Sequence, residues 1–141
     1  MLQENLVEIG ERGMSGGNME DIKEFLKRGT HFYPMWKVRE KGIEWLCGEL
    51  RYAYEGTGAV YVHFDMDVLG GAGPAPGDLL GELAEPIGMT DYEVLRLSHG
   101  IGKRCFNALS FICIPPGSAV IYRLIPYVIM YMLAGKIIAK K

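Results

Sequence analysis

The stretch AVYVHFDMDVLGG, residues 59–71, ends an apolar segment with two aspartates that are one residue apart. Side chains alternate between the two faces of a strand, so Asp65 and Asp67 are expected to share a face with His63. If the strand belongs to a parallel sheet, both carboxylates lie at its carboxyl end, where sites in such sheets form. Two carboxylates this close repel each other unless a cation lies between them, and Mn²⁺ and Mg²⁺ prefer oxygen ligands. The alternative is that Asp67 caps the turn and Asp65 pairs with a basic residue.

The rest of the chain alternates short apolar segments with longer amphipathic ones. We expect strands at residues 5–10, 30–35, 59–68 and 106–114, and helices at residues 18–29, 38–56, 90–104 and 118–139. Alternation of this kind predicts an α/β fold with a mainly parallel sheet. Residues 1–141 are expected to form a single domain, because no linker, internal repeat or low-complexity segment is visible.

Charge and cysteine content exclude several classes of protein. Fifteen basic and 17 acidic residues give a net charge of −2, which does not provide the basic surface that binds nucleic acid. Cys47, Cys105 and Cys113 are too few and too widely spaced for a disulfide framework or a thiolate zinc site. We expect free, mostly buried thiols in a reducing, cytoplasmic environment.

The C-terminal segment is the most apolar part of the sequence. Its uncharged run, residues 124–135, is shorter than the ~20 residues that span a bilayer. Arg123, Pro126 and Lys136 interrupt the wider window. A buried core helix is therefore expected rather than a membrane anchor, and the first ten residues lack the pattern of a signal peptide.

Three stretches carry a resemblance to a known family. VYVHFDMDVL (60–69), APG (75–77) and EPIGMTDYEVLRL (85–97) resemble motifs of the ureohydrolases, which include arginases, agmatinases and formimidoylglutamases. IGERG (9–13) and PPGSA (115–119) extend the resemblance more loosely over the chain.

The resemblance implies a three-layer α/β/α, arginase-like fold, of which this chain is similar to the C-terminal half. It also implies a hydrolase of linear C–N bonds that acts on a small guanidino substrate and releases urea, with a hydroxide bridging two Mn²⁺ ions as the attacking group. Asp65 matches the aspartate that bridges both ions, and Asp67 matches the one that chelates a single ion. Glu93 matches a glutamate that binds the guanidinium group. Its alternative role is structural, since Thr90 followed by Glu93 has the form of a capping box.

The sequence also departs from the family pattern. Gly70 and Gly71 replace an Asp-Pro pair, and SFICIPPG (110–117) lacks the acidic residues that usually precede the proline. The family takes further metal ligands from Gly-Gly-Asp-His and Asp-Ala-His-x-Asp motifs, and neither string occurs here. We therefore expect a partial chain that binds Mn²⁺ weakly by itself. It would associate with its own copies or with a complementing N-terminal half.

Two histidines have weaker functional interpretations. His63 is interpreted as a supporting residue rather than a third ligand, and His99 as a surface or packing residue. Two other functions stay open at this point. The chain could be a non-catalytic or relic subunit that acts by association, or a different Asp-x-Asp metal enzyme that acts on phosphate esters or nucleotide sugars. Neither a nucleic acid nor a membrane is expected as a partner.

Overall fold

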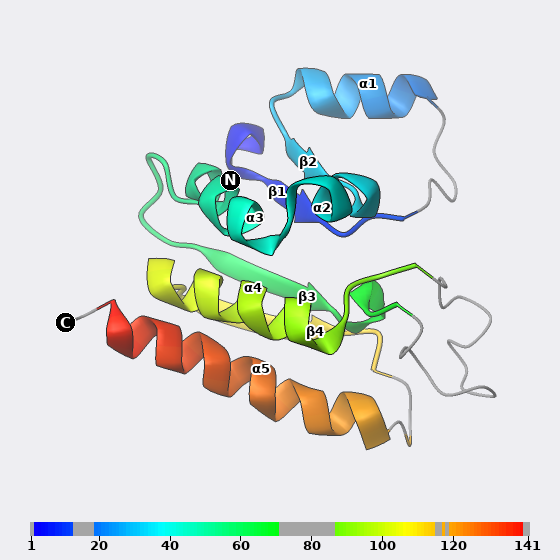
Figure 1. The fold of residues 1–141 in the computed structure, drawn as a ribbon. Coiled ribbons are helices and arrows are strands. Elements are labelled where there is room, and N and C mark those ends of the chain that lie inside the picture. The colour runs from blue at the N-terminus through cyan, green and yellow to red at the C-terminus, as the bar shows by residue number, and fades with distance from the viewer. Residues whose placement is uncertain (1, 13–18, 71–86, 115–116, 118, 140–141) are drawn as a thin grey trace. The chain divides into compact units, whose positions relative to one another are not determined.

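The computed structural model describes residues 2–12, 19–70, 87–114, 117 and 119–139 (Figure 1). The chain divides into two compact units, Met1–Gly58 and Ala59–Lys141. Both units combine parallel strands with helices, which confirms the predicted α/β class. The expectation of a single domain over residues 1–141 stays a prediction.

Within its described residues, the first unit contains a two-stranded parallel sheet and three α-helices. Strand β1 pairs with strand β2 from Val7 opposite His31 to Ile9 opposite Tyr33. In chain order the elements are η1 (Gln3–Asn5), β1 (Val7–Ile9), α1 (Met19–Lys27), β2 (His31–Tyr33), α2 (Met35–Lys41), α3 (Ile43–Glu49) and η2 (Leu50–Ala53). The strands at 5–10 and 30–35 and the helix at 18–29 are therefore confirmed with shorter bounds, and residue 18 lies outside the described residues.

The prediction of one continuous helix at 38–56 is wrong, because the structure has the separate helices α2, α3 and η2 there. Gly42 has φ +81° and separates α2 from α3. Glycine enters this left-handed region without the steric cost that a Cβ atom adds, so the chain can turn here between two short helices. Helix α2 also begins earlier than expected, at Met35 directly after Pro34, which lacks the N–H group that a helix start leaves unpaired.

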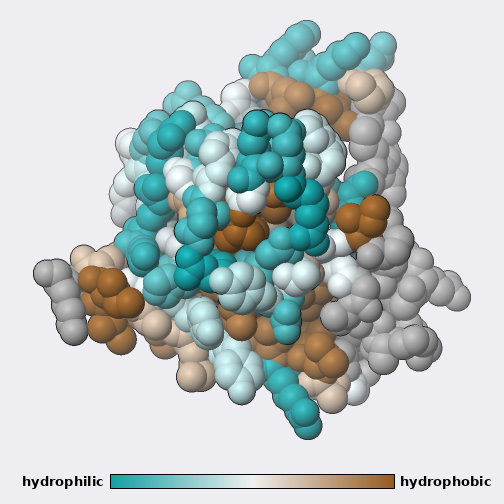
Figure 2. All heavy atoms as spheres, viewed as in Figure 1, coloured by the Kyte–Doolittle hydropathy of each residue, from teal (hydrophilic) through white to brown (hydrophobic). Residues whose placement is uncertain are grey.

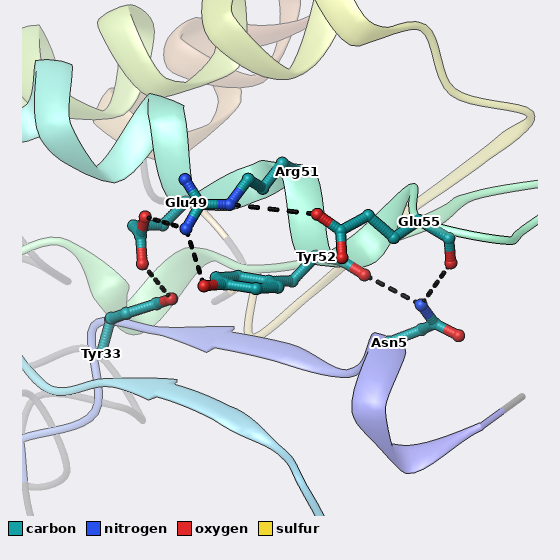
Figure 3. A network of polar contacts seen from close by, with 6 residues as sticks. All are labelled: Asn5, Tyr33, Glu49, Arg51, Tyr52 and Glu55. Carbon is teal, nitrogen blue, oxygen red and sulfur yellow. Dashed lines mark hydrogen bonds and ion pairs between the residues drawn. The ribbon is translucent and has the colours of Figure 1, made fainter.

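A polar network connects α3 and η2 with β2 and η1 in the first unit (Figure 3). Tyr33 donates its hydroxyl to Glu49 Oε2 at 2.8 Å, and the Arg51 guanidinium lies 3.2 Å from Glu49 Oε1. Asn5 Nδ2 donates to the carbonyl oxygens of Tyr52 and Glu55 at 2.9 and 2.8 Å. Burial, followed by the bond to Glu49, raises the pKa of Tyr33, so this phenol stays protonated as a donor.

The second unit contains β3 (Tyr61–Asp65), η3 (Met66–Val68), α4 (Asp91–Arg104), β4 (Ala108–Ile112) and α5 (Ala119–Ile138). Strands β3 and β4 pair in parallel, from Tyr61 opposite Ala108 to Asp65 opposite Ile112. The helices expected at 90–104 and 118–139 are confirmed. The strand expected at 59–68 is shorter, because the chain turns into η3 directly after Asp65.

Helices α4 and α5 pack closely against each other. A Cβ atom on Gly102 would collide with the Met132 carbonyl oxygen, and one on Gly135 would lie 2.8 Å from the Lys103 nitrogen. The backbones of α4 and α5 are therefore in direct contact where the helices cross at Gly102 and Gly135. Larger side chains pack on either side of this contact. On α4 and α5 the buried apolar side chains are Val94, Leu97, Ile101, Ile121, Leu124, Val128 and Met132.

The other side of α5 is exposed and apolar. Tyr127 and Met130 are 52% and 59% exposed. The remaining exposed large side chains on this face are Val120, Tyr122, Ile129, Tyr131, Leu133, Ile137 and Ile138. Hydrophobic residues are visible along the lower part of the molecule in Figure 2, where Figure 1 places α5. The expectation of a buried core helix is thus confirmed for one side of α5 only.

Within the described residues, α5 is also long and apolar enough to cross a membrane by length and composition alone. A helix that packs one side in a protein core passes the same test. Pro126 lies inside α5, as do Arg123 and Lys136. The absence of a membrane partner stays a prediction.

Candidate metal centre

Asp65 and Asp67 lie at the point where β3 changes into η3. Asp65 is the last residue of β3, and its Oδ1 accepts a hydrogen bond from the Asp67 backbone N–H at 3.3 Å. We expected strand alternation to place both carboxylates on one face. This explanation is wrong, because the strand ends at Asp65 and Asp67 lies in η3. The tight turn of η3 brings the two side chains together instead.

A third potential ligand comes from the neighbouring strand. Asp65 is opposite Ile112 in the parallel ladder, and Cys113 directly follows Ile112. One carboxylate oxygen from Asp65, one from Asp67 and the Cys113 sulfur all lie within 4.8 Å of one another. All three residues are partly buried. The carboxyl ends of two parallel strands thus form a cluster of two carboxylates and one thiol.

The backbone and the protonation of Cys113 both reflect this position. Cys113 has φ +54°, in the left-handed region that residues with a Cβ rarely adopt. Burial raises the pKa of the Cys113 thiol to about 12, with further contributions from its hydrogen bond to Asp65 and from the charges of Asp65 and Asp67. Without a cation the sulfur therefore carries its proton and donates it toward Asp65.

The structure corrects the expectation for the cysteines. Within the described residues Cys47, Cys105 and Cys113 form no disulfide, as expected, but each is only partly buried. Cys113, for which the sequence predicted no role in a site, lies in the carboxylate cluster. The signal that could have found it is its place directly after a strand, since neighbouring parallel strands bring their carboxyl ends to one edge.

Glu93 has the structural role that was the alternative to substrate binding. Its Oε2 accepts from the Thr90 N–H at 2.8 Å and from the Thr90 hydroxyl at 3.0 Å, while the Glu93 N–H donates to Thr90 Oγ1 at 3.2 Å. This is a complete capping box at the start of α4. Glu93 is not a member of the Asp65–Asp67–Cys113 cluster. A role in substrate binding stays a prediction.

The two histidines of the second unit also lie outside the cluster. His63 Nδ1 is 2.8 Å from the Ser110 hydroxyl on β4, and Tyr61 contacts both groups. His63 therefore bonds across the exposed face of the sheet, and its interpretation as a supporting residue stays a prediction. His99 is a partly buried residue of α4 whose carbonyl oxygen meets Gly135.

The glycine that follows the carboxylate pair is explained by a close approach of two backbone segments. A Cβ atom on Gly70 would lie within 2.8 Å of the Ile87 carbonyl carbon and closer still to the Gly88 backbone. Gly70 N–H donates to the Met89 carbonyl at 3.0 Å, and Met89 N–H donates to the Val68 carbonyl at 2.8 Å. A residue with a side chain does not fit at position 70 unless the segments separate. The motif at 75–77 lies outside the described residues.

The donor atoms decide which cations fit the cluster. Two carboxylates are suitable ligands for Mn²⁺ or Mg²⁺, and they repel each other unless a cation is present. Sulfur is a softer donor that Zn²⁺ and Co²⁺ accept more readily than Mn²⁺ does. The cluster therefore fits a divalent ion, although its atoms are not the all-oxygen set that Mn²⁺ prefers.

Comparisons with known proteins agree with the α/β fold. The sequence model of the family described as the arginase family matches residues 1–118. Formimidoylglutamase from Bacillus subtilis has a similar fold, with a TM-score of 0.79 at 22% sequence identity over 95% of this chain. Arginase from Bacillus caldovelox has a TM-score of 0.68 at 23% identity over 94% of this chain. Trypanosoma cruzi formiminoglutamase with Mn²⁺ has a TM-score of 0.73 at 20% identity over 95%.

The chain is shorter than the proteins it resembles. It spans 42% of the Bacillus subtilis and Bacillus caldovelox chains and 45% of the Trypanosoma cruzi chain. No curated protein matches the sequence. Since the family model covers most of the chain, the similarity extends beyond the carboxylate motif to the fold of both units.

Proposed function

Because this chain belongs to the arginase family, we propose that it takes part in metal-dependent hydrolysis of a C–N bond in a small guanidino or amidine compound, with Mn²⁺ as the cation. The observation that carries the proposal is the cluster at the carboxyl ends of β3 and β4, where ligand atoms of Asp65 and Asp67 lie within 4.8 Å of each other. Further support comes from Trypanosoma cruzi formiminoglutamase, which was solved with Mn²⁺.

In this proposal Asp65 and Asp67 bind the cation. A bound divalent ion supplies Lewis acidity and lowers the pKa of a coordinated water toward neutrality. The protein fixes the two carboxylates through the end of β3 and through the hydrogen bond from Asp67 N–H to Asp65 Oδ1. That bond orients Asp65 before a cation arrives, which lowers the entropy cost of binding.

Glu93 is the proposed contact for the planar cationic head of the substrate, because a carboxylate accepts paired hydrogen bonds from such a group. The capping box engages Oε2 of this residue. The Glu93 carboxylate would therefore bind the substrate and the first turn of α4 at the same time. Its hydrogen bonds to Thr90 fix the position of the carboxylate.

The described cluster is too small for a two-ion centre on its own. We infer that a complete centre takes further ligands from outside residues 1–141, from a segment with the Gly-Gly-Asp-His and Asp-Ala-His-x-Asp motifs that this sequence lacks or from a second copy. The exposed apolar face of α5 supports association, because a large exposed apolar patch commonly marks an interface.

The test is hydrolysis of arginine, agmatine, guanidino acids and N-formimidoylglutamate in the presence of Mn²⁺. Release of urea, ammonia or formamide is measured for the chain alone and for the chain mixed with an N-terminal half from a relative. Asp65→Asn should abolish any activity, while Tyr92→Phe on the exposed surface should not. Activity that survives Asp65→Asn would remove the metal assignment.

A non-catalytic subunit is the second candidate, and the exposed side of α5 is the observation that favours it. Such a subunit would associate through α5 and contribute structure rather than chemistry. Light scattering over a range of concentrations should then show a stable oligomer that Met130→Glu weakens. Trp36→Glu, which changes a similarly exposed residue of the first unit, is the matched control. A monomer at all concentrations would exclude self-association.

A further inference from the structure

The third member of the carboxylate cluster is a sulfur atom. Among the described residues, the group of potential metal ligands that lies close enough together consists of Asp65, Asp67 and Cys113. Of these three residues, the resemblance gives a role to the two aspartates. Cys113 lies beside them because Ile112 of β4 is opposite Asp65 of β3.

The positions of the three atoms are compatible with one ion. Metal–oxygen bonds of about 2.1 Å and a metal–sulfur bond of about 2.3 Å separate the ligand atoms of one ion by at most about 4.4 Å. The three atoms already lie within 4.8 Å of one another. The three atoms therefore need to move only a short way toward one another to share an ion.

The chemistry of the donor atoms then determines the preferred ion. Thiolates favour Zn²⁺ and Co²⁺, whereas carboxylates alone suit Mn²⁺ and Mg²⁺. We propose that Cys113 is the third ligand of the cation that Asp65 and Asp67 bind, and that its sulfur raises the affinity of this centre for Zn²⁺ and Co²⁺ relative to Mn²⁺. The proposal rests on the proposed function in one respect, namely that the aspartates bind a divalent cation.

Binding through Cys113 exchanges a proton for a metal ion. The S–H bond breaks, the sulfur lone pair forms the bond to the cation, and the proton passes to the buffer. No electron is transferred, so the metal and the sulfur keep their oxidation states. One proton is therefore released for each ion that binds in this way.

The chain contains a matched control for this ligand. Cys105 is also partly buried and also has a positive φ, +67° against +54° for Cys113. It lies at the end of α4 and is not a member of the cluster. Replacement of either cysteine by serine changes the thiol and the local backbone environment in the same way, and only one replacement removes a ligand.

The experiment is a titration of the full chain with Co²⁺, followed by absorption spectroscopy. Thiolate-to-cobalt charge transfer gives a near-ultraviolet band that oxygen ligands do not produce. The band should appear in the natural protein and in Cys105→Ser, and should be lost in Cys113→Ser. Zn²⁺ affinity should fall by on the order of tenfold or more in Cys113→Ser. Loss of a residue that only hydrogen-bonds to a metal ligand already costs about this much, and loss of the ligand itself costs at least as much. Mn²⁺ affinity should change less.

A second variant covers the case in which Cys113→Ser folds poorly. Aspartate tolerates positive φ better than most residues, so Cys113→Asp should retain the fold, as circular dichroism would show. This variant has an all-oxygen set and should bind Mn²⁺ more tightly relative to Zn²⁺ than the natural protein does. An unchanged ratio would overturn the proposal, as would a natural protein without the cobalt band or a band that survives in Cys113→Ser.

The outcomes separate this proposal from the proposed function. A cobalt band that requires both Cys113 and Asp65, without hydrolysis of any guanidino or amidine compound, supports the thiolate ligand and removes the enzymatic function. Hydrolysis that depends on Asp65 and Mn²⁺, without a cobalt band, supports the enzyme and removes the thiolate ligand.

Discussion

A Cβ atom on Gly135 of α5 would lie 3.1 Å from the carbonyl carbon of Gly102 on α4. Two helices that approach this closely leave no volume for a methyl group, so Gly102→Ala should force them apart. We expect a loss of about 1–3 kcal/mol in the free energy of unfolding, the usual cost of overpacking. Denaturant titration of the natural protein and of Gly102→Ala measures the difference in the free energy of unfolding.

Gly48→Ala is the control for the intrinsic effect of alanine in a helix. Gly48 lies in α3, and a Cβ there would meet no other atom within 4 Å. This change should stabilise the protein by about 0.4–1 kcal/mol, because alanine has fewer unfolded conformations to lose. Equal effects of the two substitutions would contradict the close helix approach.

Tyr33→Phe should destabilise the first unit through the polar network of Figure 3. The change removes the 2.8 Å hydrogen bond to Glu49, whose side chain is 15% exposed and depends on Tyr33 and Arg51 for its polar contacts. An unsatisfied, largely buried oxygen costs about 1–3 kcal/mol. Thermal unfolding measures the loss. Tyr92→Phe, at an exposed position of α4, should leave the melting temperature unchanged.

Glu8→Gln should change how stability depends on pH. Burial within β1, with a smaller contribution from Glu11, raises the pKa of Glu8. A carboxyl with a raised pKa in the folded state contributes stability below its unfolded pKa, and this contribution is lost as the pH rises through the folded value. The variant should therefore be more stable than the natural protein near pH 7 and equally stable well below about pH 4. Melting temperatures across that range test the sign, and a variant that is less stable at neutral pH would contradict it.

Glu93→Gln separates the two roles of this side chain. Glutamine also completes a capping box, so the start of α4 should remain intact and the melting temperature should change little. Loss of the negative charge should weaken binding of a guanidinium substrate, which appears as a raised KM in any hydrolysis that is found. Glu93→Ala should lose both functions and about 1 kcal/mol of stability. An unchanged KM in Glu93→Gln would leave the residue with its capping role only.

The sequence predicted the elements well where one residue type determines the local geometry. Thr90 and Glu93 defined the capping box at the start of α4. The alternation of short and long apolar segments was sufficient to predict parallel strands joined through helices. The motif around Asp65 and Asp67 identified the family that the match over residues 1–118 confirms.

Features that depend on contacts between distant residues could not be predicted in the same way. Gly42 divides a helix that the hydrophobic pattern presents as continuous. The place of Cys113 follows from which residue of β4 lies opposite Asp65, and this register is not visible in either segment alone. The exposed side of α5 was missed for the opposite reason, because its sequence is apolar all around and does not indicate which side is covered.

The contact of Gly70 with Gly88 has a practical consequence for engineering. Leu69 and Met89 form a parallel bridge, and the hydrogen bonds beside it join the chain just before and just after the intervening segment. Chain ends that are already joined accept an intervening segment of another length at little entropic cost. Insertions or deletions between Gly70 and Gly88 should therefore leave the carboxylates of Asp65 and Asp67 in place, which makes this point of the chain suitable for engineering.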